Sequence, residues 1–169
     1  MGAHRYLISL GSNIRHARYG QPRKVIAAAL QQFDGGEFAL VSASPIIETA
    51  PLGPSRRRYA NAVAVVGSDH GPVDALSALQ GIERDFGRTR IGQPWRARVL
   101  DIDIVMWNGG AWASDGDEGS VVIPHPAFRS RAFVLGPAAS IAGSWRDPLS
   151  GLTINHLTAR LTKPRPAPR

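Results

Sequence analysis

Two aspartates on a predicted strand form the most informative chemical pattern in this sequence. The stretch Leu100-Asp101-Ile102-Asp103-Ile104 alternates apolar and acidic residues. Because alternate side chains of a strand share a face, both carboxylates point one way and the apolar residues point into the core. Mg²⁺ usually binds one or two carboxylates together with substrate phosphates. The pattern therefore indicates a magnesium site, and its alternative is an ordinary solvent-facing strand.

A basic segment leads directly into this strand. Its residues are Arg84, Arg88, Arg90, Arg96 and Arg98, with Trp95 among them. Arginine binds phosphate oxygens through its planar, forked guanidinium group, so the segment and the aspartates together favour a phosphate and metal site. The alternative is a solvated basic loop that pairs with Asp85 and Asp101. Neither a P-loop nor a Rossmann glycine motif is present in the sequence, so a nucleotide would bind in another way.

Two further groups of residues could contact a substrate. His125 lies between Pro124 and Pro126 and is followed by two arginines, and a rigid histidine there could donate to phosphate or transfer a proton. Taken alone, such a histidine is more often a surface residue. The second group offers aromatic surfaces and one amide, which suits a flat heteroaromatic ring, although spacing alone favours core and strand packing. Its members are Tyr59, Asn61 and Phe133.

The elements that must position these residues follow the order β-α-β-β-α-β. Hydrophobic periodicity predicts strands near 6–10, 38–47, 59–66 and 99–107, and helices near 22–33 and 72–86. This order is typical of the ferredoxin-like arrangement, an α+β fold with a mostly antiparallel sheet. Beyond it we expect a loop after Ala113, a helix after Pro137 and a last helix around Asn155. These would be extra C-terminal elements.

Composition limits the class of protein. The chain has 169 residues, which predicts one domain over 1–162 and a flexible tail over 163–169. It has no cysteine, which excludes disulfides, thiolate metal sites and cysteine nucleophiles. Its net charge of +7 comes almost entirely from arginine and permits a nucleic-acid or nucleotide partner. With no membrane-length apolar run and no signal peptide pattern, we expect a cytoplasmic protein.

An ordered set of motifs resembles one known family. The motifs are Leu10-Gly11-Ser12-Asn13, Glu48-Thr49-Ala50-Pro51-Leu52-Gly53, Tyr59-Ala60-Asn61-Ala62, Ile82-Glu83-Arg84, Gly87-Arg88, Trp95, Arg98-Val99-Leu100-Asp101-Ile102-Asp103-Ile104, Pro124-His125-Pro126 and Arg131-Ala132-Phe133-Val134-Leu135. Over residues 5 to 160 the chain is similar to the 6-hydroxymethyl-7,8-dihydropterin pyrophosphokinases of folate biosynthesis. The resemblance implies a ferredoxin-like fold and pyrophosphate transfer from ATP to the pterin hydroxymethyl group, with AMP leaving.

The same resemblance implies roles for individual residues. Two Mg²⁺ ions would sit on Asp101 and Asp103, and Arg88 and Arg98 would act with them in catalysis. The residues expected around ATP are Gln80, Glu83, Arg88, Arg90, Trp95, Arg98, Ile104, His125 and Arg131. Those expected around the pterin are Thr49, Pro51, Leu52, Tyr59, Asn61, Trp95 and Phe133. The expected partners are these two small molecules, with no nucleic acid and no membrane, and the chain would act as a monomer.

The competing hypothesis is a nucleic-acid-binding module, because ferredoxin-like sheets also serve as RNA-recognition folds. That function needs aromatic residues on the central strands. Here Tyr6 and Tyr59 supply one aromatic each, both at strand starts. The paired aspartates would also face a phosphate backbone without a purpose.

The sequence departs from the resembled family at Arg96-Ala97, where a more rigid turn is usual.

Overall fold

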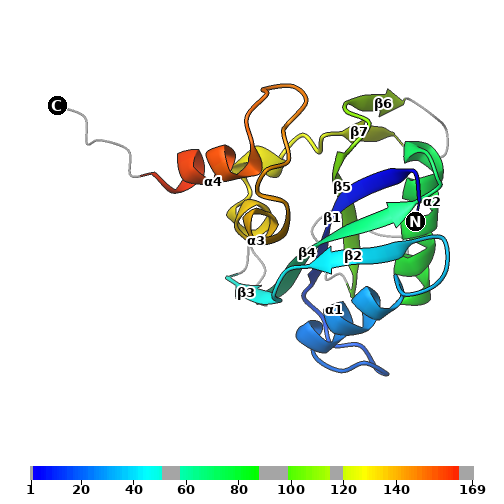
Figure 1. Cartoon of the computed structure of the whole chain (residues 1–169). Coiled ribbons are helices and arrows are strands. Elements are labelled where there is room, and N and C mark those ends of the chain that lie inside the picture. The colour runs from blue at the N-terminus through cyan, green and yellow to red at the C-terminus, as the bar shows by residue number, and fades with distance from the viewer. Residues whose placement is uncertain (1, 51–57, 88–98, 115–119, 164–169) are drawn as a thin grey trace.

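The computed structural model describes residues 2–50, 58–87, 99–114 and 120–163 and is built on a five-stranded antiparallel sheet. The strand order is β2-β4-β1-β5, and β3 pairs with β4 next to β2. The strand bounds are β1 His4–Ser12, β2 Ala39–Ala43, β3 Ile47–Thr49, β4 Tyr59–Ser68 and β5 Asp101–Trp107. This order confirms the predicted α+β arrangement with an antiparallel sheet, and Figure 1 shows the sheet between its helices.

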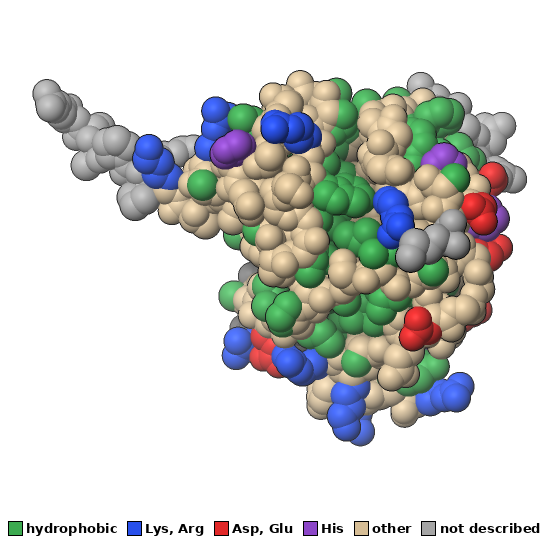
Figure 2. Space-filling model, viewed as in Figure 1, with side chains coloured by type: hydrophobic (Ala, Val, Ile, Leu, Met, Phe, Trp, Pro, Cys, Tyr) green, Lys and Arg blue, Asp and Glu red, His purple; other side chains and the backbone are tan. Residues whose placement is uncertain are grey.

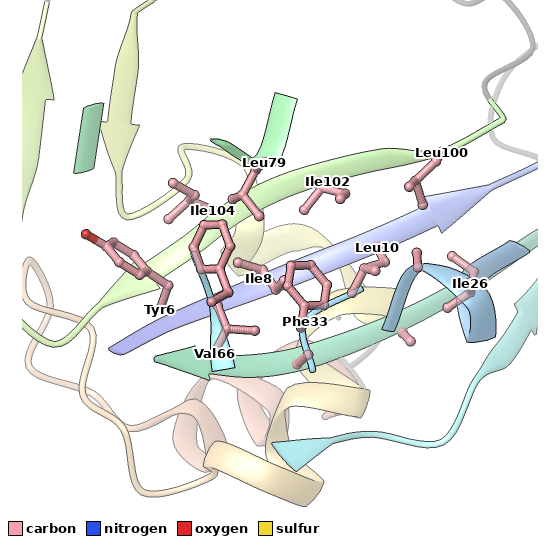
Figure 3. Packing of buried hydrophobic residues seen from close by; sticks show 14 of the residues in the cluster. Tyr6, Ile8, Leu10, Ile26, Phe33, Val66, Leu79, Leu100, Ile102 and Ile104 are labelled. Carbon is pink, nitrogen blue, oxygen red and sulfur yellow. The ribbon is translucent and has the colours of Figure 1, made fainter. Parts of the chain in front are cut away.

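Helices cover both faces of the sheet. On one face lie α1 (Pro22–Gln31) and α2 (Pro72–Asp85), which enclose the larger core. Tyr6, Ile8 and Leu10 of β1 point into that core with Phe33 and Leu79, as Figure 3 shows. The other face carries the C-terminal elements and a smaller core around Leu7 and Val65. These elements are the short 3₁₀ helix η1 (Phe128–Ser130), α3 (Ala132–Ala142) and α4 (Ile154–Thr162).

The central strands β1 and β4 are buried on both faces. From Ala60 to Ser68 every residue of β4 is buried, and most are alanine or valine. Small and β-branched residues suit a strand that packs between two helical layers. Both α1 and α2 begin at a proline, which is favoured at the first helical position because its missing N–H has no helical partner there.

The predicted strand over 38–47 is divided into β2 and β3, with Pro45 between them. Ser44 lies between the two strands and bonds this segment to β4. Its backbone N–H donates to Val63 O at 2.8 Å, and its Oγ accepts from Val63 N at 3.0 Å. Because Pro45 has no N–H to contribute to a ladder, the strand is interrupted there.

One prediction for the C-terminal third was wrong, and another was incomplete. The helix expected after Pro137 begins at Ala132 and contains Pro137. Burial of Val134, Leu135 and Ala138 against the sheet favours the continuous helix despite the lost backbone hydrogen bond. The loop expected after Ala113 is flanked by two short strands that pair, β6 (Trp112–Ser114) and β7 (Val121–Ile123). The residues between them, 115–119, lie outside the described residues.

Within the described ranges, no helix has the length and apolar character needed to span a membrane. The predicted tail over 163–169 lies outside the described residues from 164 onward.

Candidate active site

Two polar cross-strand rows lie on the sheet face that α3 and α4 partly cover. Gly11 of β1 pairs with Asn61 of β4 on one side and with Asp101 of β5 on the other. Ser9 pairs in the same way with Val63 and Asp103. Paired residues of antiparallel strands share a face, so both rows point to the same side. Further along the strands this face is apolar and buried.

The predicted alternation of β5 is confirmed. Asp101 and Asp103 are half-buried, whereas Ile102 and Ile104 are 4% and 5% exposed in the core beneath α1 and α2. Glu83 of α2 supports this strand at its outer side. Its buried carboxylate accepts a hydrogen bond from Ile102 N at 2.7 Å, between the two aspartates. This bond fixes the strand backbone at the point where the carboxylates project.

His125 and Arg131 converge on Asp103. His125 Nε2 lies 3.8 Å from Asp103 Oδ2, and Arg131 Nη1 lies 3.4 Å from the same oxygen. The histidine backbone is tied to β5, because His125 N donates to Val105 O at 2.9 Å. Its Nδ1 accepts from Ala127 N at 3.1 Å, which turns Nε2 toward the aspartate.

The charge state of His125 follows from its surroundings. Burial lowers the pKa of His125 below its ordinary value, and Arg131 lowers it further, while Asp103 and Asp101 act in the opposite direction. The lowered pKa favours the neutral ring at pH 7. Since Nδ1 accepts a hydrogen bond, the proton lies on Nε2, and Nε2–H can donate to an oxygen at the site.

Thr49, Tyr59 and Asn61 come together at the junction of β3 and β4. Asn61 is 5% exposed, and its Nδ2 donates to Thr49 Oγ1 at 2.8 Å. Tyr59 pairs with Thr49 across the two strands. Phe133, at the start of α3, lies with its ring 5.8 Å from the guanidinium carbon of Arg131. The amide group and the carboxylate group thus share one face of the sheet, with Gly11 between them.

The remaining predicted site residues fall into two sets. Gln80 lies half-buried on α2, and Ile104 lies in the core, on the opposite side of β5 from Asp103. The rest are outside the described residues, namely Pro51, Leu52, Arg88, Arg90, Trp95 and Arg98. Gly11 was not predicted as a site residue, although it belongs to one of the motifs quoted above.

A cavity of about 580 Å³ lies beside the site, between the end of β1, the start of α1 and the β3-β4 junction. Its walls include Asn13, Arg15, Arg23, Arg58 and Tyr59. Figure 2 shows basic side chains along the lower edge of the molecule, where Figure 1 places α1 and β3. Tyr59 lines this cavity and lies on β4 two residues before Asn61.

Residues 7–143 match the model of the family described as 7,8-dihydro-6-hydroxymethylpterin-pyrophosphokinase, abbreviated HPPK. This match spans β1 through α3 and includes both polar rows. The chain belongs to the HPPK family. It is therefore an ATP-using pyrophosphokinase of folate biosynthesis, as the sequence resemblance predicted.

Bacterial relatives of the chain are named for the same pyrophosphokinase activity. A 2-amino-4-hydroxy-6-hydroxymethyldihydropteridine pyrophosphokinase of Pseudomonas aeruginosa is 38% identical over 146 residues, which cover 85% of this chain and 84% of the relative. One from Haemophilus influenzae is 33% identical and covers 80% of this chain and 79% of the relative.

Among solved structures, the wild-type HPPK-DHPS of Plasmodium falciparum superposes with a TM-score of 0.72. Sequence identity is 12%, and the match covers 93% of this chain and 41% of that longer chain. At this identity the likeness concerns the fold alone. It agrees with the antiparallel sheet and C-terminal helices of this HPPK chain.

Proposed function

We propose that the two polar rows form the catalytic centre, in which this chain transfers pyrophosphate from ATP to 6-hydroxymethyl-7,8-dihydropterin. The observation that carries the proposal is the row Asn61-Gly11-Asp101, which sets a ring-reading amide beside a carboxylate on one sheet face. A pterin held at Asn61 directs its hydroxymethyl arm across the glycine toward the polyphosphate. No side chain stands on Gly11 to obstruct it.

The donor set of β5 fits Mg²⁺. Asp101 and Asp103 provide hard oxygen ligands on one half-buried face. Among the residues that the structure describes, no cluster of three or more His, Cys, Asp or Glu side chains could enclose a metal. Mg²⁺ commonly keeps open positions for substrate phosphates, so two carboxylates are sufficient. When bound, two such ions would neutralise charge on the ATP phosphates.

His125 and Arg131 are proposed to bind the polyphosphate beside Asp103. A neutral Nε2–H and a guanidinium can both donate to non-bridging oxygens, and the guanidinium also offsets negative charge. Their distances to Asp103 support this assignment, since a phosphate close to that carboxylate would be close to both donors. The other proposed ATP residues are Gln80, Glu83, Arg88, Arg90, Trp95, Arg98 and Ile104, of which Arg88 and Arg98 would act in catalysis. Ile104 would contribute through its backbone, because its side chain faces the core.

Asn61 is proposed to read the pterin ring. Its Nδ2 donates to Thr49 Oγ1, which fixes the amide plane and presents Oδ1 as an acceptor toward a ring N–H. Tyr59 and Phe133 supply aromatic surface for a flat ring. Pro51, Leu52 and Trp95 would complete the pocket.

The reaction then depends on positioning and charge. The pterin hydroxyl oxygen attacks the β-phosphorus and releases its proton to solvent, a new O–P bond forms, and the bond from the β-phosphorus to the oxygen retained by AMP breaks. Residues on the rigid central strands hold the two reactants, which lowers the entropic cost of bringing them together. Arg131 and His125 stabilise charge that is redistributed over the phosphate oxygens.

The nucleic-acid alternative loses support from the position of Tyr6. This residue is fully buried in the core beneath α1 and α2, and its hydroxyl donates to His70 O at 2.6 Å. It therefore offers no stacking surface to a base. The nucleic-acid hypothesis needs aromatic residues on β1 and β4, and Tyr59 is the one that remains there.

The test is AMP formation from ATP, measured with and without the dihydropterin and with and without Mg²⁺. We expect AMP to form at a substantial rate only when all three are present, in a one-to-one ratio with pterin pyrophosphate. AMP formation that does not depend on the pterin would contradict the proposed transfer. Turnover that is unchanged by chelation of divalent cations would contradict the metal assignment.

A further inference from the structure

A partly buried ion pair joins η1 to the loop that follows α3. Arg129 Nε donates to Asp147 Oδ2 and Arg129 Nη2 donates to Asp147 Oδ1, both at 2.7 Å. Asp147 is fully buried, whereas the Arg129 side chain is 32% exposed. Two parallel bonds to one carboxylate hold the guanidinium in a single orientation, which a single bond would not do.

The loop that presents Asp147 is itself rigidly bonded. Ser150 Oγ donates to Asp147 Oδ2 at 2.5 Å, and Leu149 N donates to Oδ1 at 3.1 Å. The Asp147 backbone bonds to Leu152 O through its N–H and to Gly151 N through its carbonyl. Asp147 is therefore a fixed point against which Arg129 is held.

Arg129 lies in η1, the turn that joins the two groups facing Asp103. Phe128 N donates to His125 O at 3.1 Å, and Arg131 N donates to Phe128 O at 3.2 Å. The Phe128 ring is buried, and the Arg129 guanidinium carbon lies 4.7 Å from its centre. The turn is thus held at its middle by Asp147, while His125 precedes it in the chain and Arg131 follows it.

We propose that Arg129, held by Asp147, is a positioning residue that sets Arg131 and His125 against Asp103. The inference rests on the proposed role of Arg131 in binding the polyphosphate. A stabilising role alone explains the pair poorly, because replacing a buried ion pair with apolar side chains is often neutral or stabilising. Apolar side chains could pack this turn, but they could not fix its rotation in the way that two directed bonds do.

The test is a double-mutant cycle on kcat between Arg129→Met and Arg131→Met. Each variant is assayed for AMP formation well below its melting temperature, with saturating ATP and pterin. We expect Arg129→Met to lower kcat about 10- to 100-fold, as small misplacements of catalytic groups do. In the Arg131→Met background the same change should cost less than about threefold, because the group it positions is already gone. Arg129→Lys, which keeps the charge but not the fork, should recover part of the loss.

Arg146→Met is the matched control. Arg146 belongs to the same loop, is exposed, and its Nη1 donates to Gly151 O at 3.0 Å, within the loop itself. Its kcat should stay within about twofold of the wild type. If Arg129→Met does not fold, Arg129→Lys replaces it in the cycle under the same criterion.

Equal losses of kcat from the Arg129 change in both backgrounds would overturn the inference. A purely structural effect of that change would lower kcat by the same factor whether or not Arg131 is present. A wild-type kcat for Arg131→Met would overturn the proposed role of Arg131 first, and the inference with it. These two failures are distinguished by the Arg131→Met variant alone.

Discussion

Asn61 and Asp101 lie in one cross-strand row, each paired with Gly11 of the central strand. Neighbouring strands are about 4.8 Å apart, so the two backbones are separated by roughly 10 Å across the glycine. The residue proposed to read the pterin and the first proposed metal ligand are therefore held on one rigid surface. Their separation is set by the sheet and not by a loop.

Gly11→Ala tests whether this surface is the floor of the substrate site. A Cβ at this position would lie 3.4 Å from Asn61 Oδ1, which the fold tolerates but which fills the space over the row. We expect the KM for the pterin to rise about 10-fold, close to 1.4 kcal/mol, with the melting temperature unchanged. Gly67→Ala, at the far end of β4, is the control, because its Cβ would meet no atom closer than 3.8 Å. A normal KM in Gly11→Ala would place the pterin elsewhere.

Asn61→Ala should weaken pterin binding and leave ATP binding nearly intact. Loss of the amide leaves a buried ring donor without its acceptor, which costs about 1 to 3 kcal/mol. Thr49→Val should act in the same direction with a smaller effect, since it frees the amide to rotate. Titration calorimetry with the pterin and with a non-hydrolysable ATP analogue separates the two affinities. Equal losses for both ligands would show that Asn61 supports the fold and does not read the ring.

Much of this site could be predicted from local sequence. The alternation of β5 correctly predicted that Asp101 and Asp103 share a face, because a strand has a period of two. The order of strands and helices likewise predicted the antiparallel sheet. These features depend on residues that are close together in the sequence, so the spacing of apolar residues predicts them.

Contacts between distant segments could not be predicted in this way. Asp103 contacts His125 and Arg131, which are 22 and 28 positions away, only because η1 and α3 pack on the same face of the sheet as Asp103. The pairing of Arg129 with Asp147 depends on a loop whose sequence has no periodicity. The position of α3 was mistaken because Pro137 reads locally as a helix start, while burial of its apolar neighbours decides otherwise.

The Arg129–Asp147 pair predicts an acid-dependent loss of stability. Burial alone would raise the pKa of Asp147, but hydrogen bonds from Arg129 and Ser150 outweigh it and hold the pKa below its ordinary value of 3.8. With a folded pKa below the unfolded one, the carboxylate stabilises the fold above the unfolded pKa and loses this effect as the pH falls through the folded pKa. Asp147→Asn leaves Arg129 without its charged partner and should cost about 1 to 3 kcal/mol at pH 7.

Urea unfolding at a series of pH values checks this prediction. The difference in unfolding free energy between wild type and Asp147→Asn should stay constant from pH 7 to about 5 and shrink below pH 4. A difference that is the same at pH 3 and pH 7 would show that the ionised carboxylate is not the stabilising species.

The most direct test of the catalytic centre is AMP production by Asp101→Asn and Asp103→Asn, measured together with thermal melting. Each variant should lose at least about 100-fold in turnover, on the order of 3 kcal/mol of activation free energy. Folding should survive, because each change removes one of two neighbouring half-buried carboxylates and keeps its size. Loss of turnover with an unchanged melting temperature is the result expected if these carboxylates hold the metal. Near wild-type AMP production by both folded variants would contradict it.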